Sequence, residues 1–492
     1  MTQTSAPAAA STSIGSWLDR YFHITERGST VGTEIRAGVV TFFAMAYIVI
    51  LNPLILGVTE DFTGRSLGIP QVAAATALAA GVMTIAFGVI ARYPFGIATG
   101  LGINTMVAVT FVAGEGLTWS EAMGLVVIDG IIIVLLGLSG LRTAVFVAIP
   151  NSLKAAMSVG IGLFITMIGL VDAGFVRRIP DAANTTVPVQ LGIGGSIASL
   201  PTLVFVIGLV ICGVMVAKKV PGGLFLGIVI TTVIAMILEA VHPSGPSVVD
   251  GEANPAGWSL AIPVLPDSLG GIPDLSLVGN VDIVGAFSRI GALTTALLVF
   301  SLVLANFFDA MGTMTALGKQ ADLVDADGIL PNMRQALVVE GAGAIVGGAV
   351  SASSNTVYVD SSAGIADGAR TGFANVITGF LFLLAMFLTP LYEVVPIEAA
   401  APVLVVVGCL MMGQVKDVDF TDFTVALPAF LMMIVMPFTY SITNGIGVGF
   451  VAYGVLRLIT GKVKDTHWLI WVVSVLFIIY FAMNPIMAAI SA

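Results

Sequence analysis

The chain has 492 residues, of which 57% are hydrophobic and only 10% are charged. Soluble globular proteins carry roughly 25% charged residues, so this composition excludes an ordinary cytosolic enzyme, a disordered chain and a secreted disulfide scaffold. The formal net charge of −10 also argues against a nucleic-acid partner, because a phosphate backbone attracts Lys and Arg. The sequence therefore predicts a protein whose surroundings are the lipid bilayer.

Long apolar runs follow one another along the chain, and each is a candidate membrane helix because about 20 apolar residues cross the hydrocarbon. The runs cover residues 37–57, 71–91, 119–139, 150–171, 201–217, 222–241, 292–317, 335–350, 372–393, 398–415, 422–438, 443–460 and 467–488. Two further stretches, Ile97–Gly114 and Ser351–Gly372, are apolar but interrupted by Gly and Ser. Counting both as spans predicts about fourteen segments up to Thr460.

Residues 1–30 are predicted to form a tail rich in Ala, Ser and Thr, followed by a short helix on the membrane surface. The tail lacks the basic region and apolar core of a signal peptide. With both interrupted segments counted as spans and the N-terminus inside, most of the 19 Lys and Arg residues face the cytoplasm. The positive-inside rule therefore predicts a multi-pass protein of the cell membrane with a cytoplasmic N-terminus.

The predicted spans divide into two halves, residues 31–241 and 289–460, on either side of a polar stretch. That stretch, residues 242–288, is rich in Pro, Gly and Asp and is predicted to be an extracellular loop. About seven spans in each half would invert the second half relative to the first, which is the usual build of secondary transporters. Residues 461–492 carry an extra apolar segment, and the sequence leaves open whether it spans the membrane.

The interrupted segments take the third position of each half, and such a pair is the best pointer to a transporter site. Thr356–Val359 is a β-prone run, and the backbone of an extended piece cannot face lipid. We therefore predict that Ile97–Gly100 and Ser354–Val359 pair as two short antiparallel strands in the middle of the membrane. A half-helix would follow each strand, with Asp360 as an N-cap residue of one and Asn104 at the start of the other.

The acidic residues left inside the predicted spans are Asp129, Asp309, Glu340 and Asp360. Ionisable groups in the membrane are costly and functional by default. Asp309 and Asp360 adjoin aromatic or Gly/Ser-rich breaks, which is the pattern of a small-ligand pocket. For Asp129 and Glu340, a hydrogen bond across the helix bundle is the favoured interpretation. For Asn104, helix capping and substrate contact both stay open.

The predicted pocket combines carboxylates with the aromatic residues Phe307, Phe308 and Tyr358 and has no intramembrane Lys or Arg. A planar heterocycle fits such a site, because its N–H groups bond to carboxylates and its face stacks on aromatic rings. All three histidines lie outside the spans. A transported proton would therefore use a carboxylate, with Asp309 as the first choice and Glu340 as the competing candidate.

At these residues the chain resembles the nucleobase–cation symporters of the xanthine/uracil permease superfamily, in the adenine/guanine/hypoxanthine permease branch. The resemblance runs from Gly32 to about Thr460 and is most specific at Phe308–Thr313 and Tyr358–Gly372. It implies an all-α membrane fold with fourteen spans in a 7+7 inverted repeat, interrupted at spans 3 and 10. It also implies a core domain (spans 1–4 and 8–11) that slides against a gate domain (spans 5–7 and 12–14).

The resemblance extends to single residues of the predicted site. Asp309 matches the family's acid on the eighth span, and Asp360 matches the tenth-span acid, which is usually Glu. Thr313 falls where the uracil branch has His, and Asn104 matches a third-span Asn of the purine branch. The predicted substrate site also includes Phe308, Tyr358 and Val359.

The sequence thus predicts import of a purine nucleobase (hypoxanthine, guanine or adenine) by proton symport through elevator-like alternating access. No enzyme, metal or cofactor site is predicted, because the spans contain no nucleophile–base pair and no cluster of metal ligands. The alternatives are a passive channel or a same-fold carrier of another small solute such as uracil, xanthine or an anion. The choice of purine, coupling to Na⁺ instead of H⁺, and pairing into a homodimer stay open.

Overall fold

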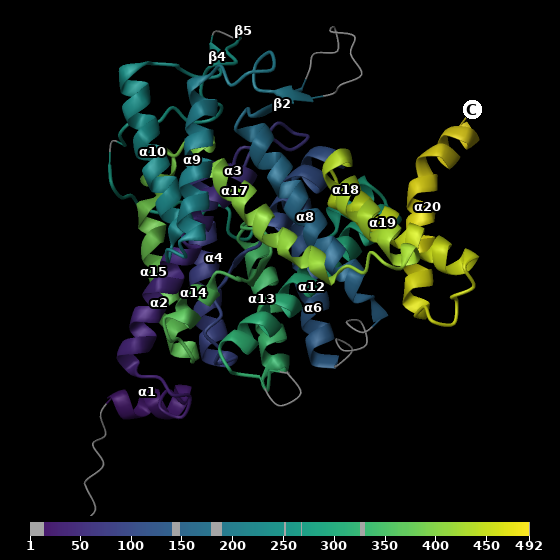
Figure 1. Cartoon of the computed structure of the whole chain (residues 1–492), viewed down its shortest axis with the longest axis horizontal. Helices are drawn as coiled ribbons and strands as arrows, with labels where there is room; N and C mark the ends of the chain where they lie inside the picture. The colour runs from purple at the N-terminus through teal and green to yellow at the C-terminus, as the bar shows by residue number, and fades with distance from the viewer. Residues whose placement is uncertain are drawn as a thin grey trace, which may run out of the picture.

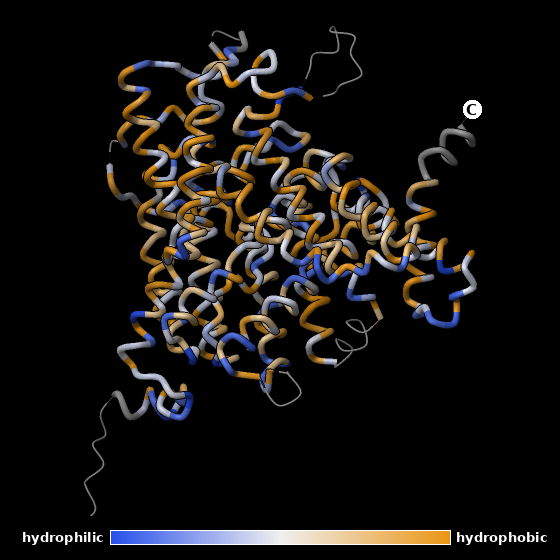
Figure 2. The backbone as a smooth tube through the Cα atoms, in the orientation of Figure 1, coloured by the Kyte–Doolittle hydropathy of each residue, from blue (hydrophilic) through white to orange (hydrophobic). Residues whose placement is uncertain are grey.

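The computed structural model describes residues 14–139, 148–178, 189–249, 252–266, 268–324 and 330–491. Figure 1 shows a bundle of helices, and three small two-stranded sheets accompany them. Within the described residues, nine helices are long and apolar enough to cross a membrane, and four shorter apolar helices accompany them. Apolar residues line most of the helices in Figure 2, whereas polar residues gather near the helix ends and in the connections. The predicted all-α polytopic membrane fold is confirmed.

The first half of the chain contains helices that match the predicted spans to within a few residues. In chain order they and the first interrupted segment are α1 (Ile14–Phe22), α2 (Val31–Met45), α3 (Ile48–Leu56), α4 (Ile69–Ile90), β1 (Ile97–Thr99), α5 (Leu101–Thr105), the π-helix η1 (Met106–Gly114), α6 (Trp119–Ser139), α8 (Asn151–Asp172), α9 (Leu200–Ala217) and α10 (Gly223–Val241). The first predicted span is divided between α2 and α3, and the break falls at Ala46 and Tyr47.

The second half follows the same order of long and interrupted elements. Its elements are α11 (Gly285–Arg289), α12 (Ala292–Gln320), α13 (Met333–Ala349), β6 (Asn355–Val357), α14 (Ser361–Ala366), α15 (Gly372–Ala385), η3 (Met386–Leu388), α16 (Thr389–Tyr392), α17 (Ile397–Met411), η4 (Met412–Asp417), α18 (Phe423–Thr439), α19 (Ile442–Ile459) and α20 (Trp468–Ser491). In Figure 1 the last helix, α20, lies at the edge of the molecule beside α19.

Two small hairpins in the connections were not predicted from the sequence. One pairs β2 (Val176–Arg178) with β3 (Val189–Leu191), and the other pairs β4 (Val248–Val249) with β5 (Glu252–Ala253). The second hairpin belongs to the polar stretch that separates the two halves. Trp258 in the same stretch is almost fully buried, so this loop packs on the helices instead of extending freely.

The predicted pairing of the two interrupted segments is confirmed. Strands β1 and β6 are antiparallel, with Ile97 opposite Val357 and Thr99 opposite Asn355, so each strand is shorter than predicted. All six strand residues are buried. Backbone groups here have no water to bond with, and side chains supply partners: the Thr84 hydroxyl lies 2.9 Å from Ile97 N and 2.8 Å from Ile97 O.

The helices pack as two groups, which correspond to the core and gate domains. The core group contains α2–α6 and α12–α15 with both short strands, and the gate group contains α8–α10 and α17–α19. Small residues let the core helices approach closely, as is usual in membranes. A methyl group on Gly130 of α6, for example, would lie 2.6 Å from the Gly341 carbonyl oxygen of α13.

Candidate functional site

A cavity of about 450 Å³ lies where the two short strands meet the gate domain. This volume falls within the range of roughly 300–1,000 Å³ that is typical of small-molecule sites. Core and gate both contribute to its wall. The lining residues are Tyr47, Gly100, Leu101, Gly102, Ile103, Ile161, Ile165, Ala305, Asp309, Thr313, Thr356, Val357, Tyr358, Val359, Asp360, Ser362, Val407, Leu410, Met411 and Gln414.

Asp360 lies at the cavity, directly before α14, as the sequence predicted. Its carboxylate does not cap that helix, however, which corrects the expectation of an N-cap hydrogen bond: Asp360 has φ −61° and ψ −17°, so its backbone is already helical. The carboxylate instead accepts a hydrogen bond from the Tyr47 hydroxyl at 3.1 Å. Asp360 is therefore positioned by the break between α2 and α3 and presents an acceptor to the cavity.

Asp309 reaches the same cavity from α12. Its side chain is half-buried, and no hydrogen bond or ion pair reaches it from the described part of the chain. Thr313 lies one helical turn further along α12 and also lines the cavity. The two pocket acids thus come from separate elements, and one of them keeps its hydrogen-bonding capacity for a ligand.

Tyr358 forms an aromatic part of the cavity together with Tyr47. Their ring centroids are 6.3 Å apart with an interplanar angle of 45°. The Tyr358 hydroxyl donates to the Thr99 carbonyl oxygen at 2.5 Å, which ties the ring to strand β1. Val359 lines the cavity with an exposed side chain, as expected for a group next to an open site.

Asn104 is not among the described residues that line the cavity. Asn104 lies inside α5, whose N-cap position is Gly100, so it does not begin the half-helix. Its buried amide donates to the Thr99 hydroxyl at 3.1 Å, and its amide oxygen has no partner within the described residues. Phe308 belongs to α12, but its side chain lies outside the described residues. The proposed substrate contacts of both residues stay predictions.

Glu340 lies in α13, is fully buried and does not line the cavity. Asp129 of α6 is also fully buried and accepts from the Asn306 amide at 2.9 Å. The hydrogen bond that the sequence favoured as an explanation is present for Asp129. For Glu340 neither carboxylate oxygen has a hydrogen-bond partner in the part of the chain that the structure describes.

Sequence reasoning missed the gate side of the cavity and Tyr47. Ile161 and Ile165 come from α8, whereas Val407, Leu410 and Met411 come from α17. These residues are apolar in apolar helices, so nothing in their pattern separates a cavity wall from a lipid-facing surface. Tyr47 had one usable signal, since it is an aromatic residue with a polar group five residues before Asn52 and Pro53 in the same span.

A second cavity of about 570 Å³ adjoins the first and shares Asp309, Thr313 and Gln414 with it. Its own lining includes Lys154 near the start of α8 and Lys319 near the end of α12. Both lysines belong to the helix ends that the positive-inside rule assigns to the cytoplasm. The first cavity therefore continues toward the predicted cytoplasmic side.

Comparison with known proteins identifies the family. Residues 32–448 match the Permease family, whose members include the xanthine and uracil permeases. The chain belongs to this family. The permease is 37% identical to the guanine/hypoxanthine permease PbuG of Bacillus subtilis, and the alignment covers 94% of this chain and 99% of PbuG. It is 35% identical to the adenine permease AdeP of Escherichia coli, over 94% of this chain and 95% of AdeP.

A solved structure supports the fold of the permease independently of sequence. The transmembrane domain of the cyanobacterial bicarbonate transporter BicA superposes with a TM-score of 0.57, covering 85% of this chain and 96% of that domain. At 16% identity this likeness concerns the fold alone. The family and the apolar helices together make the permease a multi-pass membrane transport protein and not an enzyme.

Proposed function

We propose that this permease imports purine nucleobases (hypoxanthine, guanine or adenine) together with protons. The observation that carries the proposal is a cavity with two carboxylates and two tyrosine rings at the meeting point of the interrupted spans. The names of the relatives PbuG and AdeP, a guanine/hypoxanthine and an adenine permease, support a purine as the ligand. The cavity wall contains no Lys or Arg among the described residues, which disfavours an anion.

In the proposed complex, the base lies between the carboxylates and hydrogen-bonds both of them. A purine presents N–H donors at its edge, and a carboxylate is an acceptor with two oxygens. The Tyr47 hydroxyl orients the Asp360 carboxylate through its hydrogen bond. The base stacks on the ring of Tyr358. The exposed Val359 and the first residues of α5, Leu101–Ile103, form the remaining edge.

We propose that Asp309 takes up the transported proton before the base binds. A carboxylate surrounded by apolar residues is stabilised in its neutral form. Neutralisation lets the core domain pass the apolar gate, because moving a bare charge through such a barrier costs several kcal/mol. Glu340 is the alternative carrier, although its position outside the cavity wall favours Asp309.

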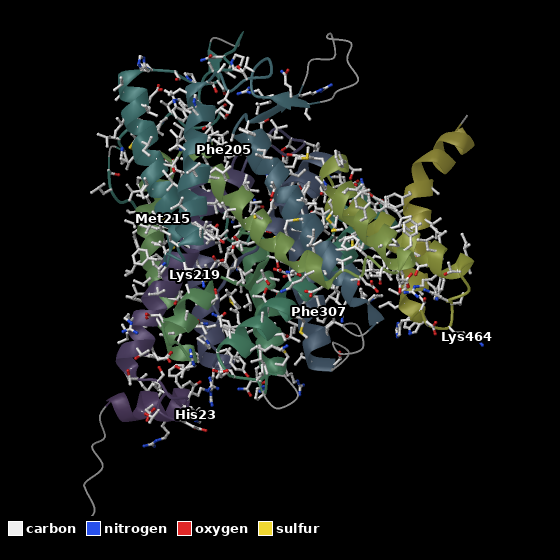
Figure 3. All side chains as sticks on the ribbon, viewed as in Figure 1. His23, Phe205, Met215, Lys219, Phe307 and Lys464 are labelled. Atoms are coloured by element: carbon white, nitrogen blue, oxygen red, sulfur yellow. The ribbon has the colours of Figure 1, made fainter. Side chains whose placement is uncertain are left out.

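Elevator-like movement of core against gate accounts for access from both sides. In Figure 3, Lys219 at the turn between α9 and α10 lies well above His23, which follows α1. The second cavity extends from Asp309 toward Lys154 and Lys319. This arrangement fits a core domain displaced toward the cytoplasm, with the ligand cavity facing inward.

Uptake of a radiolabelled purine into cells, with unlabelled competitors, tests the proposed function. We expect hypoxanthine, guanine or adenine to compete at low concentration, and uracil, xanthine, sulfate and bicarbonate to compete weakly or not at all. In proteoliposomes an inward proton gradient should drive accumulation, whereas a Na⁺ gradient should not. Uptake that merely equilibrates under every gradient would show a passive channel.

Changing Tyr47 to Phe tests the role assigned to Asp360. The variant loses one hydrogen bond to a charged group, which costs about 1.5–3 kcal/mol, so base affinity should fall about ten- to hundredfold. Equilibrium binding of the labelled base to purified protein measures the effect. Tyr392→Phe is the matched control, because this buried hydroxyl bonds to the Ala385 carbonyl oxygen outside the cavity, and its affinity for base should match the wild type.

A further inference from the structure

A second set of buried polar groups lies in the core domain beside the ligand cavity. Asp129 of α6 accepts hydrogen bonds from the Asn306 amide at 2.9 Å and from the Ser354 hydroxyl at 3.4 Å. Four oxygen atoms of this set have no hydrogen-bond partner among the described residues. They are the other carboxylate oxygen of Asp129, the amide oxygen of Asn306 and both carboxylate oxygens of Glu340. We call Asp129 and Glu340 the inner acid pair. Both side chains are fully buried.

Helices α6 and α13, which carry the inner acid pair, contact each other beside both acids. Gly130 follows Asp129 and Gly341 follows Glu340, and a methyl group on Gly341 would lie 2.9 Å from the Gly130 carbonyl oxygen. Asp129 and Glu340 therefore flank the same close contact between α6 and α13, and α12, which carries Asp309, also packs on α6. The other elements packed against α13 are α4, β1 and β6, and none of them contains a charged residue.

The unsatisfied atoms of this set are all hydrogen-bond acceptors. Carboxylate and amide oxygens accept hydrogen bonds but donate none. Two ionised carboxylates sharing a dry site are strongly unfavourable, and such a pair binds a proton that belongs to both groups. A bound proton would supply both the missing positive charge and one O–H donor. The set therefore has the chemistry of a cation site.

Thr356 connects the inner acid pair with the ligand cavity. This residue of β6 lines the cavity, and β6 packs on α13, the helix that carries Glu340. The buried Thr356 hydroxyl and both carboxylate oxygens of Glu340 have no hydrogen-bond partner among the described residues. A hydroxyl both donates and accepts, so it can take a proton on one side while it releases its own on the other.

We propose that the inner acid pair binds one proton in addition to the proton on Asp309, and that the Thr356 hydroxyl transfers it to and from the cavity. In the transfer the O–H bond of Glu340 breaks and its proton moves to Thr356 Oγ. The original hydroxyl proton of Thr356 passes to a water molecule in the cavity. The pair is left with one more negative charge, and the cavity group gains one positive charge. This inference rests on the proposed proton symport.

The number of protons moved per base tests the proposal. Purified full-length permease in proteoliposomes, with the membrane potential clamped at zero, is given an inward gradient of one pH unit and labelled hypoxanthine. Two protons per base give an accumulation of about a hundredfold, and one proton gives about tenfold. We expect about a hundredfold for the wild type and Thr356→Ser, and about tenfold for Thr356→Val, which has nearly the same shape but no hydroxyl.

Base exchange without a pH gradient shows whether Thr356→Val is folded. If this variant fails to fold, further variants still test the proposal. Glu340→Gln and Asp129→Asn should also reduce accumulation to about tenfold. Glu398→Gln removes a buried acid of the gate domain and should keep the hundredfold value. Hundredfold accumulation by Thr356→Val or Glu340→Gln would overturn the proposal. A Na⁺ gradient that restores hundredfold accumulation in these variants would overturn it as well.

Failure of this inference is distinguishable from failure of the proposed function. If the wild type accumulates about tenfold and Asp309→Asn abolishes the effect, proton symport stands and the inner acid pair is not a transport site. If no pH gradient drives accumulation by the wild type, proton symport itself is wrong, and the inference falls with it.

Discussion

Replacing Asp309 with Asn is expected to abolish concentrative uptake of purines while the protein stays folded in the membrane. Asp309 lines the cavity and is not hydrogen-bonded to any described residue, so its loss leaves the fold without a broken contact. The amide cannot take up a proton, and it loses a charge-assisted hydrogen bond worth about 1.5–3 kcal/mol to the base. Uptake of labelled hypoxanthine, normalised to the amount of permease in the membrane, measures the effect.

Asp172→Asn is the matched control for this change. Asp172 ends α8 in the gate domain, is partly buried and does not line the cavity, so its amide should leave uptake close to wild type. Equal affinity and rate in Asp309→Asn and the wild type would show that the assigned site is wrong. Proton-driven accumulation that survives Asp309→Asn but not Glu340→Gln would move the carrier role to Glu340.

The strand pair was predictable because it follows from a general constraint. A broken, β-prone segment in a membrane has backbone groups that nothing in lipid can satisfy, and the chain offers two such segments at matching positions. The observed register, with Ala98 opposite Thr356, is the solution to that constraint. Asp309 and Asp360 were predicted as intramembrane acids beside polar breaks, and Thr313 was predicted from the family resemblance. All three line one cavity together with Tyr358 and Val359.

Local side-chain geometry was harder to predict than the arrangement of spans. Asp is a favoured N-cap residue, but capping requires an extended backbone conformation that Asp360 does not adopt. The half-helix containing Asn104 begins earlier than predicted, because Gly100 closes the strand and starts the turn. The first difference is a change of backbone conformation at the predicted position, and the second is a shift of a few residues along the chain.

The sequence pattern could not predict contacts between distant spans. In the sequence, Asp129 and Glu340 each appear as a single acid in an apolar helix. They come together because α6 and α13 approach closely at Gly130 and Gly341. The Tyr47–Asp360 hydrogen bond joins the first span to the tenth in the same way. Periodicity describes the faces of one helix and contains no information about which faces meet.

Replacing Gly347 with Ala is expected to displace β6 and thereby to impair base binding from outside the cavity. A methyl group on this α13 residue would overlap the Ser353 carbonyl oxygen and lie 2.9 Å from the Asn355 amide nitrogen. The carbonyl is backbone, so the segment that leads into β6 must shift. Overpacking of this kind destabilises a protein by about 1–3 kcal/mol. We therefore expect a lower Tm and an affinity for hypoxanthine reduced by more than about tenfold.

Gly213→Ala separates this packing effect from a general effect of adding a methyl group to a glycine in a membrane helix. Gly213 lies in α9 of the gate domain, where a methyl group would meet no atom within 4 Å. Ala also favours a helix over Gly by about 0.5–1 kcal/mol, so this variant should keep the wild-type affinity and an equal or higher Tm. Gly347 differs from Gly213 because its backbone in α13 packs directly on the segment that leads into β6. Strand β6 in turn places both Thr356 and the start of α14 at the cavity. An unchanged affinity in Gly347→Ala would show that β6 tolerates movement and that the cavity is not fixed by the strand pair.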